Sequence, residues 1–266
     1  MSYARGLSIL VATLVLGACS TLAPQEEKSV APPATAFGST VPKDIHTRAR
    51  AHTELASLYF QDNNLIVALE ELTLAIAINP NYAPAYSTRG LVLYYIKELE
   101  SARKDFQRAL QLDPRDPEIN NNYGWFLCQT GNEQESIEYF QRAIGNPLYQ
   151  TPEVAYLNAG ACFIKLGDLD SAEDYLRKSQ RLAPNNPQTL YQLANLLYLR
   201  GNLDAARDYL TDVVRNSQPG PEVLWLLLRV ERRRGNAAAE ESLAMQLRRK
   251  YPDSLEYQAL LKGAFE

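Results

Sequence analysis

A small residue recurs about every 34 positions along this chain of 266 residues. It is glycine or alanine in five successive places: Ala56, Gly90, Gly124, Gly160 and Ala194. Residues of this size are needed where one helix presses closely on its neighbour. A fixed period of this length indicates a solenoid, in which each repeat buries its apolar face against the next. Because solenoids present extended surfaces, the pattern predicts a protein that binds other chains.

Residues at other positions recur with the same period. Twelve residues after each first small residue comes a second one: Ala68, Ala102, Ser136, Ala172 and Ala206. Large apolar residues recur in phase with them at Leu72, Phe106, Phe140, Leu176 and Leu210. The expected repeats are 49–82, 83–116, 117–150, 153–186, 187–220 and 221–254, with two extra residues around Asn146–Tyr149 and a closing segment at 255–266. Each repeat reads as two amphipathic helices.

Turn and stop residues complete the pattern. Glycines fall between the two helices of a repeat, at Gly131, Gly167, Gly201 and Gly235, whereas the first repeat has Asn63 there. Prolines fall just past the second helix, at Pro80, Pro114, Pro184 and Pro252. Together these features resemble the tetratricopeptide repeat (TPR). The resemblance implies an all-α, right-handed superhelical solenoid over 44–266, with about six TPR helix pairs and a C-terminal closing helix.

The first 18 residues have a different character. Arg5 supplies a positive charge, and the apolar run from Leu7 to Leu16 is too short for a permanent membrane span. The run ends at Leu16-Gly17-Ala18-Cys19, which resembles the bacterial lipobox that is cut before its cysteine. Residues 1–18 are therefore expected to be a lipoprotein signal peptide and Cys19 the lipid attachment site. The alternative is an ordinary secretory signal with a chance cysteine.

Residues 19–43 are rich in Pro, Ala, Ser and Thr and show no sustained periodicity. This composition predicts a flexible linker between a lipidated Cys19 and the solenoid. Ser20 follows the cysteine, in the place where aspartate implies retention in the inner membrane of such lipoproteins. By this resemblance, the chain is expected at the periplasmic face of the outer membrane, held by its lipid anchor.

The residues offer little chemistry. The net charge of −4 argues against nucleic acid as a partner. The two histidines, His46 and His52, have no cysteine or paired carboxylate at metal-ligand spacing, and there is no phosphate loop or nucleophile elbow. We therefore expect no enzyme activity, no metal, no cofactor and no small-molecule substrate. One basic cluster, Arg229 to Arg234, is either a solvated face or a contact for an acidic partner or lipid head groups.

The inner surface formed by the first helix of each repeat is the expected binding groove. Ser87 is placed on this surface, and so are the aromatic, amide and aliphatic candidates Tyr94, Tyr95, Asn121, Trp125, Leu157, Ile164, Tyr191, Asn195 and Tyr198. Rings offer contact area at a low entropy cost, and amides bond to peptide groups. The alternative is that some of these rings only pack between repeats.

Local motifs narrow the family. The segment Asn121-Asn122-Tyr123-Gly124-Trp125-Phe126-Leu127 is similar to one in the type IV pilus biogenesis and stability lipoproteins (the PilF/PilW family). The Leu148-Tyr149 loop and the terminal Ser254-Leu255-Glu256-Tyr257-Gln258 also resemble that family. The resemblance implies a pilotin-like protein that binds the outer-membrane secretin of the type IV pilus, assists its localisation or assembly, or stabilises pili. The alternative is a TPR lipoprotein subunit or activator of an outer-membrane protein insertion or cell-wall enzyme complex.

Two cysteines remain beyond Cys19. Cys128 and Cys162 fall late in the first helices of neighbouring repeats, so their thiols are expected to lie near each other. An oxidising periplasm makes such a pair a disulfide candidate. The alternative is that both are free buried thiols, because packed helices usually lie about 8–10 Å apart whereas a disulfide needs Cα atoms within about 7 Å.

Overall fold

The computed structural model describes residues 44–265, which lie in the second of two units into which the chain divides, 41–266. The expected signal peptide 1–18, the linker 19–43 and Cys19 lie outside the described residues. Within 44–265 there are thirteen α-helices and no strand, which confirms the all-α solenoid predicted from the repeat.

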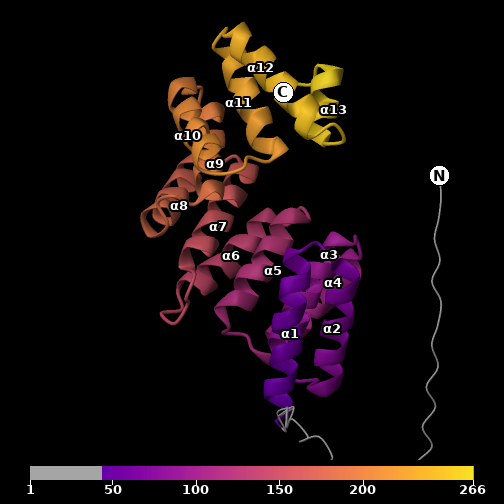
Figure 1. The fold of residues 1–266 in the computed structure, drawn as a ribbon. Helices are drawn as coiled ribbons and strands as arrows, with labels where there is room; N and C mark the ends of the chain where they lie inside the picture. Colours follow the sequence, from indigo (N-terminus) through magenta and orange to yellow (C-terminus); the bar gives the residue numbers. More distant parts are fainter. Residues whose placement is uncertain (1–43, 266) are drawn as a thin grey trace, which may run out of the picture. The chain divides into compact units, whose positions relative to one another are not determined.

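The helices form six pairs and one closing element (Figure 1). The first helices of the pairs are α1 (Ile45–Gln61), α3 (Ala83–Tyr95), α5 (Pro117–Gln129), α7 (Pro152–Leu166), α9 (Pro187–Leu199) and α11 (Pro221–Arg233). The second helices are α2 (Leu65–Ile78), α4 (Leu99–Leu112), α6 (Glu133–Ile144), α8 (Leu169–Leu182), α10 (Leu203–Asn216) and α12 (Ala237–Lys250). The closing helix is α13 (Leu255–Lys262).

Local sequence explains where the helices begin. Proline is the first residue of four first helices, where its fixed φ suits the helix and its missing N–H costs nothing. Asp116 caps α5 by accepting a hydrogen bond from the Ile119 amide at 2.9 Å. The first helix starts earlier than the expected Ala49, because Asp44 accepts hydrogen bonds from the amides of His46 and Thr47 and so caps α1 at Ile45.

The small residues of the repeat lie beneath large ones of the same repeat. A Cβ placed on Gly90 would come within 2.9 Å of the Phe106 ring, and one on Gly160 within 2.6 Å of Leu176 Cγ. Real Cβ atoms do not approach other atoms this closely, so these positions need glycine. The second small residues and the large residues of all five repeats are fully buried. The repeat phase read from the sequence therefore describes the core.

The helix pairs stack in chain order, with each first helix against the next one. The backbones of α1, α3, α5, α7, α9 and α11 approach one another in sequence, whereas those of successive second helices stay further apart within the described residues. Closer spacing on one side bends such a stack, so the first helices line its inner face. Phe106 of α4 fills the space between pairs, with its ring centroid 5.1 Å from that of Phe126 on α5.

The turns inside the pairs use the left-handed backbone conformation. Glycine takes it in the later repeats, for example at Gly167 with φ of 78°. In the first repeat Asn63 has φ of 57°, and in the second Lys97 has φ of 70°. Lysine pays a steric penalty in this region because of its Cβ, whereas asparagine is tolerated better.

The two-residue insertion forms the loop between α6 and α7. Thr151 is the residue before α7 and is of a type that often caps helices, but its side chain makes no cap hydrogen bond. The Thr151 hydroxyl instead donates to Glu118 Oε1 at 3.0 Å and ties the loop to α5. Burial raises the pKa of Glu118, and the threonine hydrogen bond opposes that shift in part. Tyr149 of the loop is buried.

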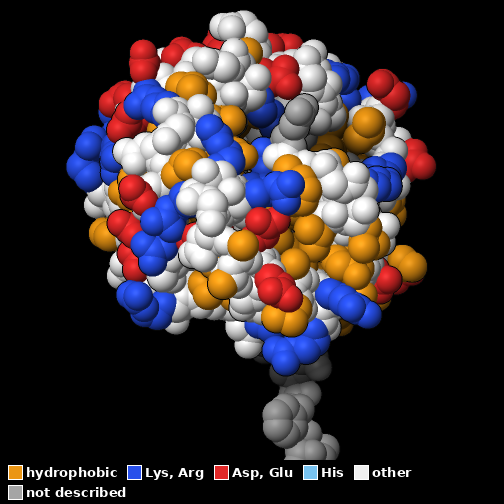
Figure 2. All heavy atoms as spheres, turned by 90° about the horizontal axis from the view of Figure 1, so that it is seen from above, with side chains coloured by type: hydrophobic (Ala, Val, Ile, Leu, Met, Phe, Trp, Pro, Cys, Tyr) orange, Lys and Arg blue, Asp and Glu red, His pale blue; other side chains and the backbone are white. Residues whose placement is uncertain are grey.

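The last pair is covered by α13, which Ser254 caps through a hydrogen bond from the Tyr257 amide. Seen from the α11–α13 end, acidic and basic side chains are interspersed, and hydrophobic side chains gather on one side of the view (Figure 2). Large apolar residues exposed on α12 and α13 include Met245, Leu255 and Leu261. Among the described residues, no helix has the length and hydrophobicity needed to span a bilayer.

Candidate functional site

An aromatic cluster lies on the first helices of the first three repeats. Trp125 of α5 stacks against Tyr95 of α3, with ring centroids 6.1 Å apart and planes 12° apart. Tyr94 meets Trp125 edge to face at 4.8 Å, and Phe60 of α1 meets Tyr95 in the same way at 5.2 Å. Tyr95 is 48 % exposed, whereas Tyr94 and Trp125 are partly buried. The structure thus brings three of the predicted groove residues into one cluster with an accessible face.

Beside this cluster is a cavity of about 220 Å³. It is lined by residues of α5, α6, α7 and α9, namely Trp125, Cys128, Gln129, Phe140, Leu157, Asn158, Ala161, Gln188 and Gln192. Four of these side chains carry amides, which donate and accept hydrogen bonds as peptide groups do. A ring next to a row of amides suits an extended peptide, because the ring supplies buried area and the amides bond to its backbone. We call the aromatic cluster and this cavity the inner groove.

Polar side chains behind the groove form hydrogen bonds between neighbouring first helices. Their burial shows that two of the predicted groove residues do not face a partner. Asn122 Nδ2 donates to Ser87 Oγ at 3.2 Å, and Asn158 Nδ2 donates to Asn121 Oδ1 at 3.0 Å. Asn121 is 3 % exposed and Ser87 is 2 % exposed. Both were expected to face a partner. Instead, their hydrogen bonds link α3 to α5 and α5 to α7, and these bonds satisfy polar groups that are buried from water.

Tyr198 is also not a groove residue. It is 6 % exposed, and the guanidinium groups of Arg229 and Arg233 lie 4.7 and 4.8 Å from its ring centroid. Arg229 Nε donates to the Phe265 carbonyl at 3.0 Å, so the C-terminal segment is tied over the same region. These contacts bury the Tyr198 ring between α9 and α11.

The basic cluster at Arg229 to Arg234 lies at the surface and forms ion pairs with neighbouring helices. Arg234 pairs with Asp204 at 2.8 Å and with the buried Glu231 at 3.0 Å. Arg232 donates to Glu240 at 2.6 Å. Arg232 and Arg233 remain exposed, as the solvated-face alternative expected, while the ion pairs link α11 to α10 and α12.

The other predicted groove residues have mixed positions. Leu157 lines the cavity, and both Leu157 and Ile164 pack partly on the core. Asn195 is partly buried, and so is Tyr191, whose pKa is raised by burial. Lys165 lies close to the cavity and donates to the Cys128 carbonyl at 3.2 Å and to Gln129 Oε1 at 2.8 Å. Burial lowers the pKa of this lysine.

The two cysteines lie directly under the inner groove. Cys128 of α5 and Cys162 of α7 are joined by a disulfide in the structure, with Cα atoms 5.9 Å apart. This is shorter than the usual spacing of packed helices and lies within the range that a disulfide requires. Cys128 also lines the cavity beside Trp125, so the bond fixes two helices of the groove.

The first repeat carries an exposed apolar surface that the sequence reading missed. Leu58 on α1 is 59 % exposed, and Ile66 and Leu74 on α2 are 74 % and 45 % exposed. The places equivalent to Ile66 and Leu74 in the second repeat hold charged residues, Glu100 and Arg108. Comparing the residues at equivalent positions of different repeats, as well as the pattern that they share, would have revealed this surface in the sequence.

Known proteins share this fold and pattern. Two family models described as "Tetratricopeptide repeat" match residues 92–218 and 191–254. The type IV pilus assembly protein PilF of Pseudomonas aeruginosa is 29 % identical over 208 residues, which cover 78 % of this chain and 82 % of PilF. The fold and the helix-pair pattern define a TPR protein.

Two solved structures specify the family. The structure of PilW, described as a widely conserved type IV pilus biogenesis factor, aligns with a TM-score of 0.70 at 33 % identity and covers 80 % of this chain and 98 % of PilW. The structure of Pseudomonas aeruginosa PilF aligns with a TM-score of 0.67 at 27 % identity, covering 82 % of this chain and 99 % of PilF. The chain belongs to the PilF/PilW family of type IV pilus biogenesis TPR proteins.

Proposed function

We propose that this chain is an outer-membrane lipoprotein that binds the secretin of the type IV pilus through its inner groove. Binding assists localisation or assembly of the secretin or stabilises pili. The observation that carries the proposal is the accessible ring of Tyr95 beside Trp125 and an amide-lined cavity, in a member of a pilus biogenesis family. Large rings next to a pocket are typical anchors in protein interfaces.

The proposed mechanism is binding combined with tethering. Lipid attached at Cys19 would hold the chain at the periplasmic face of the outer membrane, and residues 19–43 would act as the linker. Confining the groove to the membrane raises the effective concentration of a partner in the same membrane. The role assigned to the repeats is therefore that of a scaffold.

Co-purification tests the groove. The tagged full-length chain is isolated from detergent-solubilised envelope, and bound secretin is quantified. Trp125→Ala is expected to reduce secretin capture at least tenfold, since Trp125 contacts both the aromatic cluster and the cavity. Leu58→Ser, on the apolar surface of the first repeat, is the comparison variant. If only Leu58→Ser loses the secretin, the partner binds the first repeat and not the groove.

The same preparation separates the proposed partner from its alternative. If the chain captures an outer-membrane protein insertion complex or a cell-wall enzyme and no secretin, the proposal is wrong in its partner. Fractionation of Cys19→Ala tests the anchor independently. This variant is expected to leave the outer membrane while keeping its thermal midpoint, because Cys19 precedes the repeats. Outer-membrane retention without a bound partner would contradict the tether.

A further inference from the structure

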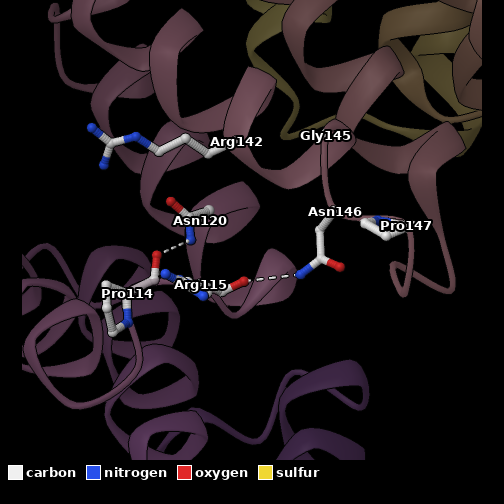
Figure 3. A pocket seen from close by; sticks show the side chains of 7 residues that line it. All are labelled: Pro114, Arg115, Asn120, Arg142, Gly145, Asn146 and Pro147. Carbon is white, nitrogen blue, oxygen red and sulfur yellow. Dashed lines mark hydrogen bonds between the residues drawn. The ribbon is translucent and has the colours of Figure 1, made fainter.

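A second cavity lies at the outer side of the third repeat, and different residues line it from those of the inner groove. Its volume is about 610 Å³, and Pro114, Arg115, Asn120, Arg142 and Asn146 are among its lining residues (Figure 3). They come from the α4–α5 loop, α5, α6 and the inserted α6–α7 loop. Asn146 Nδ2 donates to the Arg115 carbonyl at 3.0 Å and joins the two loops. We call this the outer cavity; it shares no lining residue with the inner groove.

The floor of the outer cavity holds an unsatisfied acceptor. Asn120 is 1 % exposed, and its Nδ2 donates to the carbonyls of Pro114 at 3.0 Å and Asp116 at 2.7 Å. These two bonds fix the orientation of the amide, and Oδ1 has no donor within residues 44–265. Figure 3 shows this oxygen pointing away from Pro114. A buried acceptor without a partner is unfavourable, so a donor that reaches Oδ1 from the cavity would be stabilising.

Two guanidinium groups accompany this acceptor. Arg115 is exposed, and its side chain makes no ion pair with any described residue. Arg142 pairs with Glu138 on its own helix at 2.5 Å, but half of the Arg142 side chain is exposed, and such surface pairs are weak. Two carboxylates lie near Arg115 in the chain: Asp116 caps α5, and Asp113 accepts a hydrogen bond from the Arg115 amide at 3.2 Å. The cavity therefore offers positive charge that a ligand carboxylate can use.

The outer cavity continues along the outer side of α4 and α6. A neighbouring hollow of about 610 Å³ shares Pro114 and Arg142 with it and includes Gln107, Gln111 and Tyr139. The Arg142 guanidinium lies 4.9 Å from the Tyr139 ring centroid. The joined hollows form an elongated site lined by two tyrosine rings, amides, two arginines and one carboxylate, Glu135. Such a shape suits an extended chain better than a compact ligand.

The equivalent junction two repeats further on shows that this chemistry is not general to the fold. A cavity of about 420 Å³ lies there, between α8, α9 and α10. In that cavity Asn185 stands in place of Arg115, Leu190 in place of Asn120 and Asp212 in place of Arg142. A hollow at this place follows from the stacking of helix pairs. Of the two cavities, only the outer cavity has the arginines and the buried acceptor.

We propose that the outer cavity binds an extended acidic peptide segment of a partner protein, as a second binding site in addition to the inner groove. A carboxylate of the peptide lies between Arg115 and Arg142, and a peptide N–H donates to Asn120 Oδ1. Peptide supplies both the anion and the donor. A phosphodiester group itself carries only acceptor oxygens, so it can pair with the arginines but cannot donate to Asn120 Oδ1.

Fluorescence polarisation with the purified full chain tests the site. The probe is the labelled peptide Gly-Ala-Glu-Leu-Glu-Ala-Gly, and its matched control has Gln in place of each Glu. The acidic peptide is expected to bind saturably and to lose at least tenfold in affinity in R115Q/R142Q. R181Q, an exposed arginine of α8 outside both cavities, is expected to bind like the wild type. Trp125→Ala is also expected to retain binding, which separates this site from the proposed secretin site.

Asn120→Leu tests the acceptor with both arginines present. It introduces the residue found at the equivalent place in the fifth repeat, and a loss of at least threefold in peptide affinity is expected from a variant with a cooperative thermal transition. Equal affinity for the Glu and Gln peptides, full affinity in R115Q/R142Q, or no saturable binding at millimolar concentration overturns the proposal. Binding of inorganic phosphate or phosphatidylglycerol vesicles in place of the peptide overturns it as well.

Discussion

Tyr95 and Trp125 stack across the boundary between the second and third repeats, with their ring planes 12° apart. They lie on successive first helices, α3 and α5, and neither ring is fully buried. Stacked rings at a repeat boundary form a rigid apolar platform, because few side-chain torsions remain free. Tyr95 is the exposed ring of this platform, so its substitution should affect binding and stability differently from substitution of a buried ring.

Tyr95→Ala is expected to weaken partner binding more than it weakens the fold. The Tyr95 side chain is about half exposed, so its removal should lower the free energy of unfolding by about 1 kcal/mol or less. Loss of an interface anchor typically costs about 2 kcal/mol or more of binding free energy. Quantitative pull-down of the proposed secretin partner and urea unfolding of the same preparation measure the two effects.

Tyr198→Ala serves as the opposite case. Its ring is buried and is packed against Arg229 and Arg233, so we expect a loss of about 3 kcal/mol in unfolding free energy. Partner capture by the folded fraction should stay close to that of the wild type. A Tyr198→Ala protein that is stable but does not bind would return this residue to the groove.

Gly160→Ala is expected to destabilise the fourth repeat, although alanine is the better helix former. Helix propensity alone predicts a gain of about 1 kcal/mol, whereas the new Cβ would sit 2.6 Å from Leu176 Cγ and cause overpacking worth about 1–3 kcal/mol. Chemical denaturation should therefore give a net loss. Leu176→Ala creates space at the same contact, so the double variant should be more stable than the sum of the single losses indicates.

The helices and their packing could be predicted because each repeat places small and large residues in the same pattern. Gly90, Gly124 and Gly160 lie under Phe106, Phe140 and Leu176 respectively, and five copies of one pattern remove the ambiguity of a single copy. The role of Thr151 at the start of α7 could not be read in this way. Thr151 matches a cap by type, but its hydroxyl bonds to Glu118 across the loop, a tertiary contact that a local pattern does not contain.

The groove was only partly predictable, because position in a repeat fixes the face of a helix but not the depth of a side chain. Tyr95 and Tyr198 were both placed on the inner face, yet Tyr95 is about half exposed and Tyr198 is covered by two arginines of α11. The hydrogen bond from Asn158 to Asn121 likewise depends on the exact offset between α5 and α7, which the two-residue insertion alters.

Lys97→Gly is expected to stabilise the second repeat. Lys97 adopts φ of 70°, which glycine reaches without a Cβ penalty. Lys97→Ala is the matched control, since it also loses the contact between Nζ and the Tyr94 ring at 5.4 Å but keeps a Cβ. Glycine should give an unfolding free energy about 1 kcal/mol above that of alanine. Equal values in thermal melts would show that the turn is unstrained.

Tyr149→Phe is expected to change how stability depends on alkaline pH. Burial raises the pKa of Tyr149 above its ordinary value of 10.0, so folding favours the neutral phenol. This stability is fully present below pH 10 and is lost as the pH rises through the higher pKa of the folded state. The variant should therefore lose less stability than the wild type above pH 10.

At neutral pH the same substitution should be tolerated. The Tyr149 hydroxyl is buried and has no hydrogen-bond partner among residues 44–265, so its removal is expected to be neutral or to stabilise by up to about 1 kcal/mol. Urea titrations of both proteins at neutral and alkaline pH provide the comparison. A clear loss at neutral pH would mean that the hydroxyl is satisfied, for example by a bound water.

The disulfide between Cys128 and Cys162 is expected to form in the oxidised protein and to stabilise it. The two Cα atoms are 5.9 Å apart and both residues are buried, so the bond needs no backbone movement. It closes a loop with a sequence separation of 34, for which the chain-entropy model gives about 3–4 kcal/mol. Reduction should therefore lower the thermal midpoint of the wild type, whereas Cys128→Ala/Cys162→Ala should not respond to the reductant. Mass spectrometry of the unreduced protein, alkylated after unfolding in denaturant, decides the pairing: two alkylated thiols at these positions would show that the cysteines are free.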